Sequence, residues 1–235
     1  MNQKNGQIKT AFITGANGGI GGAFARELSR RGWRLLLPVR DPLKPDAQEL
    51  ATVPRASVVK CDVGDQQQTD RYVQSFKDEG TDIDLFILAA GTWKWDSDFT
   101  GATIEEEEKA AIDFLMKANV QTKEVPFTSF ENYLTDDLKN MTGISVGSHA
   151  AHFGPGHEFR VDQIGYITAM DAAAKLTKKK QREGIYKHLL LSEPGRIDTP
   201  MAREQFARKG IEVDWSKELK PWEFAIQELR KVGLF

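Results

Sequence analysis

The chain has 235 residues, of which 40% are hydrophobic and 28% are charged, and its formal net charge is −2. This balance is typical of a globular protein with one substantial core. The nearly neutral charge argues against a protein that binds nucleic acid or acidic membrane surfaces through charge.

Two further features bear on where the protein works. No apolar stretch approaches the roughly 18 to 20 residues that cross a bilayer, and residues 1–7 are polar, without the apolar centre of a secretion signal. Cys61 is the only cysteine, so no internal disulfide can form. We therefore expect a cytoplasmic protein with no membrane or nucleic-acid partner.

Short apolar runs alternate with longer segments along the chain. In chain order, strands are predicted over 9–13, 33–39, 57–61, 84–90, 143–146 and 186–192, and helices over 19–31, 105–118, 162–182 and 221–232. This alternation predicts an α/β fold, in which residues 1–235 form a single doubly wound domain around a parallel sheet of about six strands.

The first predicted strand leads directly into a glycine cluster, residues 14–21 (TGANGGIG), which opens the first predicted helix. Gly15 permits a sharp turn, while Gly19 and Gly21 let the backbone approach a pyrophosphate group. The start of the helix would offer free N–H groups to the phosphates. The alternative is a glycine-rich turn that binds nothing, but the order of strand, glycines and helix favours a phosphate site.

The spacing T-G-x-x-x-G-I-G resembles the nucleotide fingerprint of the short-chain dehydrogenase/reductase family. Four further segments resemble that family's motifs in its order: Cys61-Asp62-Val63, residues 88–91 (LAAG), Asn119, and residues 194–201 (PGRIDTPM). The resemblance runs from about residue 8 to residue 201. It implies a Rossmann fold that binds NAD(P), with cofactor contacts from Gly15, Asn17, Gly19, Ile20, Gly21, Arg40, Asp62, Val63, Ala89, Ala90, Gly91, Pro194, Gly195, Ile197 and Thr199.

The end of the second predicted strand bears on which nicotinamide cofactor is bound. A carboxylate there would bind the 2′-hydroxyl of NAD, whereas the 2′-phosphate of NADP needs a cation. Arg40 stands at the expected position, and a guanidinium can pair with phosphate through two hydrogen bonds. We therefore favour NADP. The alternative is that Asp41 is the true tip and selects NAD.

The resemblance also implies a catalytic tyrosine, a lysine four residues later, a serine that bonds the substrate oxygen, and an asparagine. Tyr166 matches the tyrosine, but Met170 stands where the lysine belongs, and Lys175 would point to the opposite side of the helix. A cation lowers the pKa of a phenol, and bringing it from near 10 to neutrality takes about 3 units, or roughly 4 kcal/mol. Losing most of that shift would slow a step that needs the ionised tyrosine by something approaching 10³-fold.

Ser148 is the expected serine and Asn119 the expected asparagine. His149 is a rival hydrogen-bond donor for the substrate oxygen. The gap of 18 residues from Ser148 to Tyr166 exceeds the family's usual 13 or so, which predicts an insertion beside the pocket.

Several aromatic and histidine residues lie near these motifs. Trp93 and Trp95 either form an apolar wall for the substrate or cover the end of the sheet. His149, His152 and His157 raise the possibility of a metal site, but no acidic or cysteine ligand recurs at a supporting spacing, so we expect no metal.

Two functions remain open from the sequence. The first is an NADP-dependent oxidoreductase (NAD possible) that transfers hydride between nicotinamide and a small carbonyl or alcohol substrate. The second is a catalytically impaired protein that binds NADP(H) as a regulator or redox sensor, and another reaction on the same scaffold is a weaker third possibility. Family members usually end in a further strand that supports a tetramer; we expect that strand to be missing here and the helices over 105–134 and 162–182 to form a homodimer.

Overall fold

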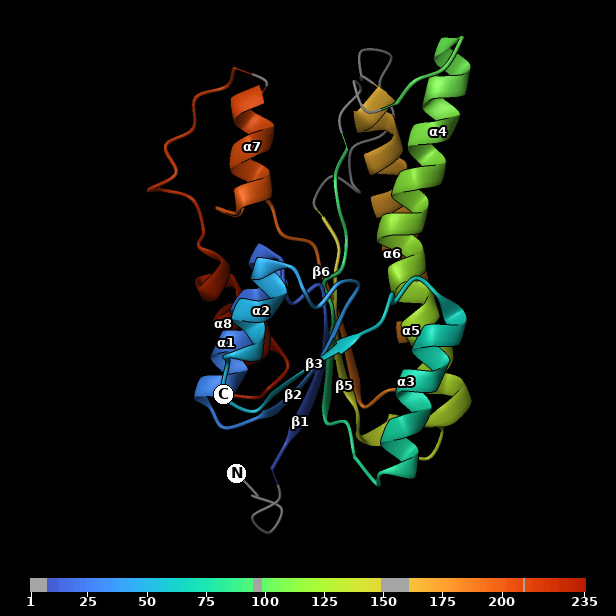
Figure 1. The fold of residues 1–235 in the computed structure, drawn as a ribbon, viewed down its shortest axis with the longest axis vertical. Helices are drawn as coiled ribbons and strands as arrows, with labels where there is room; N and C mark the ends of the chain where they lie inside the picture. Colours follow the sequence, from blue (N-terminus) through green and yellow to red (C-terminus); the bar gives the residue numbers. More distant parts are fainter. Residues whose placement is uncertain (1–7, 95–98, 149–160, 209) are drawn as a thin grey trace.

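The computed structural model describes the chain except residues 1–7, 95–98, 149–160 and 209. Its centre is one sheet in the order β3-β2-β1-β4-β5-β6, with every neighbouring pair parallel (Figure 1). The strands are β1 (Thr10–Thr14), β2 (Arg34–Val39), β3 (Ala56–Lys60), β4 (Leu85–Leu88), β5 (Thr142–Val146) and β6 (His188–Ser192). The first half of the chain winds outward from β1 and the second half outward from β4, so the topological switch point lies between these two strands.

Helices cover both faces of the sheet (Figure 1). One face carries α1 (Gly19–Arg30), α2 (Pro45–Ala51) and α8 (Pro221–Lys231); the other carries α3 (Gln66–Asp78), α4 (Ile104–Met116), α5 (Thr122–Tyr133) and α6 (Val161–Glu183). A π-helical turn, η2 (Lys117–Gln121), joins α4 to α5, and a short 3₁₀ turn, η3 (Leu138–Asn140), precedes β5. The remaining helix, α7 (Pro200–Arg208), stands beyond the carboxyl ends of the strands on the α1 side.

Alternating side chains of the central strands fill two cores. Ile13 packs into the cluster under α1 and α8, whereas Phe12 points the other way, into the cluster under α3 and α5. There the rings of Phe12 and Phe86 each lie 5.2 Å from the ring of Phe130 on α5. Because both faces are covered, the strands read as continuous apolar runs, as in parallel sheets generally.

The α4–α6 pair is held close by small residues. A Cβ at Gly165 would lie 3.0 Å from the carbonyl carbon of Ala111, so a larger residue would push the two backbones apart. Ala169 and Ala173 continue this buried face of α6. The close contact fixes α6, and with it Tyr166, relative to the helix that leads into η2.

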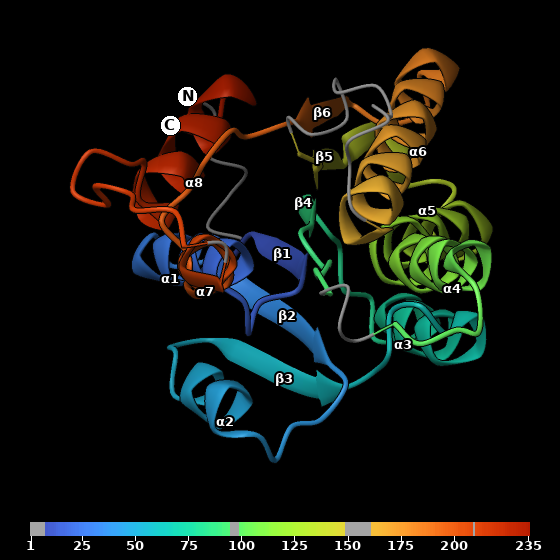
Figure 2. The ribbon, with the colours of Figure 1, turned by 90° about the horizontal axis from the view of Figure 1, so that it is seen from above.

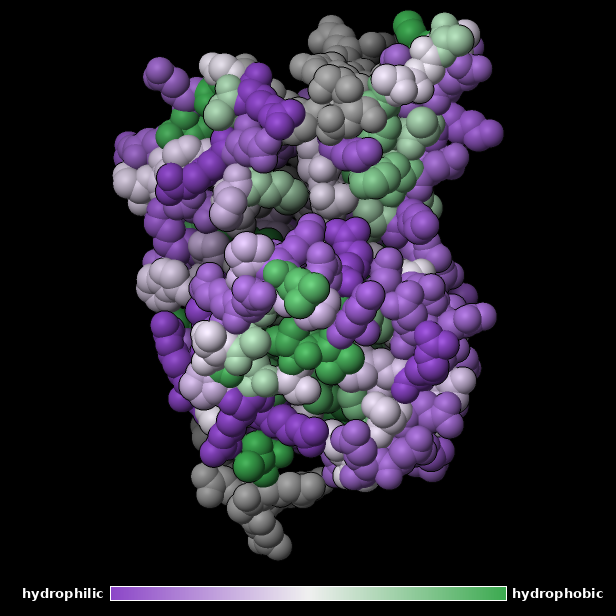
Figure 3. Space-filling model, viewed as in Figure 1, coloured by the Kyte–Doolittle hydropathy of each residue, from purple (hydrophilic) through white to green (hydrophobic). Residues whose placement is uncertain are grey.

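The structure confirms an α/β fold with one doubly wound parallel sheet, and the predicted strands and helices agree with the observed ones to within two residues. The helices α2, α3 and α7 were not placed individually by the sequence. In the described part of the chain the sheet ends at β6. None of the described helices is both long and apolar enough to cross a membrane. On the face shown in Figure 3, polar and apolar side chains of the described residues are intermixed.

Candidate active site

The predicted site residues come together at the carboxyl edge of the sheet. Parallel strands all end at one edge, and the glycine cluster, Arg40, Asp62, residues 89–91 and Ser148 each follow a strand within three residues. Figure 2 looks onto this edge, with α7 over α1 on one side and α4 and α6 on the other. The edge includes the β1–β4 switch point, where α/β sheets bind their ligands.

Gly15 and Gly21 allow the cluster to make a turn that larger residues could not make at these two positions. Gly15 has a φ of +68°, and a Cβ there would lie 2.8 Å from the carbonyl oxygen of Ala89. A Cβ at Gly21 would lie 2.3 Å from the carbonyl oxygen of Gly15, and one at Gly19 would lie 3.0 Å from the side chain of Thr199. The turn is therefore packed against the segments after β4 and before α7, as a cradle at the switch point requires.

The start of α1 offers unpaired backbone donors. Its N-cap is Gly18, which provides no side-chain acceptor, and its first turn holds no acidic residue. By contrast, Asp65 caps α3 and Thr103 caps α4 through their side-chain oxygens. The first N–H groups of a helix have no intrahelical partner, and together with the helix dipole they favour an anion. The cradle therefore fits the diphosphate of a dinucleotide.

A free cation lies on the rim of the cradle. Arg40 is exposed, and among the described residues its guanidinium takes part in no hydrogen bond or ion pair. The neighbouring Asp41 accepts a hydrogen bond from the backbone N–H of Leu43 at 3.0 Å. Asn17 donates to Asp46 at 2.9 Å and so ties the cradle to α2. The tip of β2 thus carries the exposed guanidinium of Arg40 beside a carboxylate of Asp41 that its own turn holds through one oxygen.

After β3 the chain turns through a local hydrogen bond. Asp62 accepts from the backbone N–H of Gly64 at 3.0 Å, and its own N–H donates to the side chain of Gln68 at 3.1 Å. Val63 is buried and packs into the core under α3 and α5. The carboxylate of Asp62 is thus held at the carboxyl edge by its own loop.

The peptide of Ala90 connects the cradle to the helices behind it. Its N–H donates to the hydroxyl of Thr14 at 3.1 Å. Its carbonyl oxygen accepts from the hydroxyl of Thr122 at 3.3 Å and from the ammonium of Lys123 at 3.1 Å. The same two side chains also bond the carbonyl oxygens of Ala118 and Asn119 in the π turn. A change in the π turn would therefore move the end of β4.

Asn119 holds the segment after β4 with its side-chain amide. Its Oδ1 accepts from the N–H of Thr92, and its Nδ2 donates to the carbonyl oxygens of Thr92 and Leu115, each at 3.0 Å. A Cβ at Gly91 would lie 2.5 Å from Oδ1, so glycine is needed there. Asn119 is buried, and its amide fixes the path of the chain over the sheet edge.

Tyr166 and Ser148 face each other across the site. Burial raises the pKa of Tyr166 above its ordinary 10.0, and a hydrogen bond with the side chain of Ser148 offsets part of that rise. The ring of Trp93 lies 4.4 Å from the ring of Tyr166, centroid to centroid. Met170, one turn further along α6, is buried and brings no charge. The phenol therefore stays protonated at neutral pH.

The segment between β6 and α7 closes the other side of the cradle. Ile197 is buried in the core under α1 and α8 and pairs with Leu219. Thr199 accepts from the N–H of Ala202 at 3.1 Å and so caps α7, while its methyl group meets Gly19. Pro194 and Gly195 lead into this segment from the end of β6.

Some predicted residues lie outside the described part of the chain: Trp95, His149, His152 and His157. The rivalry between Ser148 and His149, and the predicted insertion, fall there as well. Within the described residues, no group of three or more His, Cys, Asp or Glu side chains is arranged to hold a metal ion.

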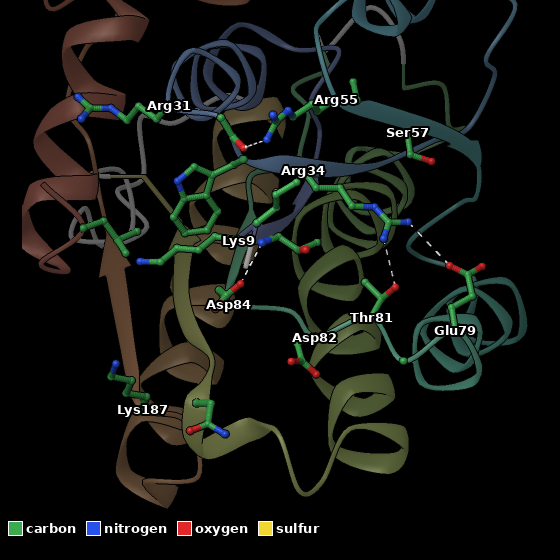
Figure 4. Close-up of a pocket in the computed structure, with 18 of the residues that line it drawn as sticks. Lys9, Arg31, Arg34, Arg55, Ser57, Glu79, Thr81, Asp82, Asp84 and Lys187 are labelled. Atoms are coloured by element: carbon green, nitrogen blue, oxygen red, sulfur yellow. Dashed lines mark hydrogen bonds and ion pairs between the residues drawn. The ribbon is translucent and has the colours of Figure 1, made fainter. Parts of the chain in front are cut away.

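A second hollow, of about 1560 Å³, lies at the opposite edge of the sheet (Figure 4). Several of its charged side chains are engaged with one another or with the backbone. Arg34 contacts Glu79 at 3.8 Å, Arg55 donates to the carbonyl oxygen of Gly32 at 2.6 Å, and Asp84 accepts from the N–H of Thr10 at 2.9 Å. This hollow is at the amino ends of the strands, where α/β sheets do not usually bind ligands.

The sequence analysis missed three residues at the carboxyl edge of the sheet, where the candidate site lies: Thr14, Thr122 and Lys123. Thr14 is the first residue of the glycine fingerprint, so its position was a usable signal. Thr122 and Lys123 follow Asn119 by three and four residues, which places them near its face of the helix. A lysine in a helix usually lies in solvent, so sequence alone gave no reason to bury Lys123.

Comparisons with known proteins agree with this geometry. A family model described as short chain dehydrogenase matches residues 9–210. An uncharacterized oxidoreductase of Staphylococcus haemolyticus is 27% identical over 207 residues, which cover 86% of this chain and 82% of the relative.

Two solved structures share the fold. One is an alcohol dehydrogenase from the archaeon Thermococcus sibiricus, complexed with 5-hydroxy-NADP, with a TM-score of 0.69 at 23% identity. The match covers 97% of this chain and 92% of that structure. A tyrosine-to-phenylalanine variant of ElxO with NADPH bound has a TM-score of 0.78 at 16% identity, and the match again covers 97% of this chain and 92% of that structure. At these identities the likeness shows the fold alone.

Proposed function

This chain belongs to the short-chain dehydrogenase family, and from that premise we propose that it is an NADP(H)-dependent oxidoreductase acting on a small carbonyl or alcohol substrate. The observation that carries the proposal is the hydrogen-bonded pair of Tyr166 and Ser148 at the same sheet edge as the glycine cradle. We propose that residues 1–235 act as one domain.

Each group has a role in the reductive direction. Reduced nicotinamide, when bound, supplies a hydride to the carbonyl carbon. Ser148 donates a hydrogen bond that orients the carbonyl oxygen, and Tyr166 gives its proton to that oxygen, so that the product is an alcohol. The tyrosinate then regains a proton from water. Burial favours the protonated phenol, so at neutral pH Tyr166 is in the form that can donate a proton.

Arg40 supports NADP over NAD. Its exposed guanidinium has no partner among the described residues, whereas Asp41 is engaged by its own turn. An unpaired guanidinium at the tip of β2 can form two parallel hydrogen bonds with the 2′-phosphate. Titration of nicotinamide fluorescence should give tighter binding of NADPH than of NADH, and Arg40→Ala should remove the difference. Equal affinities in the native protein would refute the preference.

Met170 supports a second candidate function. It is buried one turn from Tyr166, where a lysine would assist proton transfer in the family that the sequence resembles. The alternative is therefore a catalytically impaired protein that binds NADP(H) as a regulator or redox sensor.

One set of assays separates the two candidates. NADPH oxidation is followed with a panel of small aldehydes and ketones for the native protein, Tyr166→Phe and Met170→Lys. Turnover by the native protein that is lost in Tyr166→Phe supports the oxidoreductase. Turnover by Met170→Lys alone supports the sensor, and failure to bind either NADPH or NADH defeats both.

We also propose a cytoplasmic homodimer. The single cysteine fits a reducing compartment. The small-residue face of α6 is already used against α4 within the chain, so the dimer would use the remaining faces of α4, α5 and α6. Size-exclusion chromatography with light scattering tests this, and a monomer or tetramer would contradict it.

A further inference from the structure

Lys123 is a buried cation that the proposed chemistry does not use. The residue is 2% exposed, and its ammonium donates to the carbonyl oxygens of Ala90 and Asn119, each at 3.1 Å. Among the described residues no carboxylate pairs with it, and burial lowers its pKa from 10.5 to about 8. At pH 7 about nine-tenths of the molecules still carry the charge. A buried charge without a counter-ion is costly, so its presence calls for an explanation.

The position of Lys123 relative to the cradle gives one. In the sheet, β4 lies between β1, which carries the cradle, and β5, which leads to Ser148. A dinucleotide with its diphosphate at the start of α1 and its reacting ring beside Tyr166 must therefore pass the end of β4. The backbone of Ala90 and Gly91 forms that crossing, and Lys123 bonds it from the helix side.

The two redox states of the cofactor differ in charge at this end. The oxidised nicotinamide ring is positive and the reduced ring is neutral. We propose that Lys123 is a positioning residue whose uncompensated charge makes the site prefer the reduced cofactor over the oxidised one. This inference rests on the proposed function, and it favours use of the site in the reductive direction, which also needs a protonated Tyr166.

The size of the preference follows from Coulomb's law. We take a separation of about 10 Å between the two like charges; at an effective dielectric constant of about 20, they repel enough to weaken binding roughly tenfold. Loss of the charge should therefore lower the ratio of the two dissociation constants, oxidised over reduced, by roughly tenfold. Loss of the hydrogen bonds alone would weaken both forms together and leave the ratio unchanged.

Two variants separate charge from hydrogen bonding. Lys123→Gln keeps a donor near Ala90 and Asn119 but has no charge, whereas Lys123→Met has neither. Lys117→Met removes an exposed lysine from the same π turn and is the matched control. Dissociation constants for NADPH and NADP⁺ are measured at pH 7 by nicotinamide fluorescence and calorimetry, with thermal melts to show that each variant folds.

We expect the native protein and Lys117→Met to prefer NADPH, and the ratio to fall roughly tenfold in Lys123→Gln and in Lys123→Met. If Lys123→Met does not fold, Lys123→Gln decides. Binding of both cofactors with an unchanged ratio in Lys123→Gln overturns the inference and leaves the proposed function intact. Failure of the native protein to bind either cofactor overturns the proposed function and the inference with it.

Discussion

Substitution of Lys123 by methionine tests, through stability alone, whether the folded protein buries this charge. The pKa of Lys123 is lowered from 10.5 to about 8 by burial. Between these two pH values the unfolded chain keeps the proton and the folded chain releases it, so stability rises as the pH rises. Below pH 8 both states are protonated and the cost of burial is constant. Above about 10.5 neither state is protonated and the cost disappears.

The linkage relation sets the magnitude. The native protein should gain roughly 1 kcal/mol between pH 7 and pH 9 from this group, and roughly 2 to 3 kcal/mol between pH 7 and pH 10. Lys123→Met has no such group and should not show that gain. The lost hydrogen bonds to Ala90 and Asn119 shift the variant's stability by an amount that does not depend on pH, so the slope is the informative quantity.

Other groups titrate in the same range but are common to both proteins. Burial raises the pKa values of Cys61, Tyr72 and Tyr186, so their unfolded forms lose protons first and stability falls with alkaline pH. Three titratable groups on the elements around Lys123 have partners of their own: Asp62 with Gly64, Asp70 with Ser129, and Tyr166 with Ser148. The difference between native protein and variant therefore isolates Lys123.

The assay is urea unfolding followed by circular dichroism at pH 7, 8, 9 and 10. Lys117→Met, which removes an exposed lysine from the same turn, controls for the change in net charge. We expect the native and Lys123→Met curves of unfolding free energy against pH to diverge by the amounts above. Parallel curves would show that the ammonium is hydrated in the folded state, and the reasoning would fail.

Three further outcomes are expected. Asn119→Ala leaves both the N–H and the carbonyl of Thr92 without their partner, so urea unfolding should show a loss of roughly 2–4 kcal/mol. A loss of less than about 0.5 kcal/mol, which is typical of surface substitutions, would contradict the role of Asn119 as a clamp. Gly19→Val crowds Thr199 and the cradle, so NADPH affinity should fall by at least about tenfold with little change in thermal stability, whereas unchanged affinity would refute the cradle. Because burial raises the pKa of the Cys61 thiol to about 11, the native protein should react with a disulfide reagent at pH 8 roughly a hundredfold more slowly than the urea-unfolded chain, and equal rates would show that the thiol is open.

The fold and the cradle were predictable because they depend on local patterns. Apolar runs separated by helix-length segments leave few arrangements other than a parallel sheet with helices on both faces. The cradle needs glycine at fixed spacing, and Gly15, Gly19 and Gly21 show why in the structure, since a Cβ at each would meet a neighbour.

The rest of the site depends on which groups meet, and that is a tertiary property. Sequence placed Arg40 and Asp41 side by side, but only the structure shows that Asp41 is held by its own turn. Asn119 was expected in the site, but only the structure shows that its amide bonds Thr92 and the carbonyl oxygen of Leu115. Lys123 looked like an ordinary helix lysine, because nothing in the neighbouring sequence indicates that its ammonium is buried against the carbonyl oxygens of Ala90 and Asn119.

The π turn at Lys117–Gln121 has a consequence for how this chain can vary. Its wider turn absorbs one residue more than an α-helix would, so α4 can face α6 while α5 faces α3 and the sheet. Removal of one residue here would rotate α5 about its axis by about 100° relative to α4. Phe127 and Phe130 would then no longer face the core. A substitution in this turn alters single contacts, but a deletion would change which face of α5 meets the core. The length of this segment is therefore constrained more tightly than its composition.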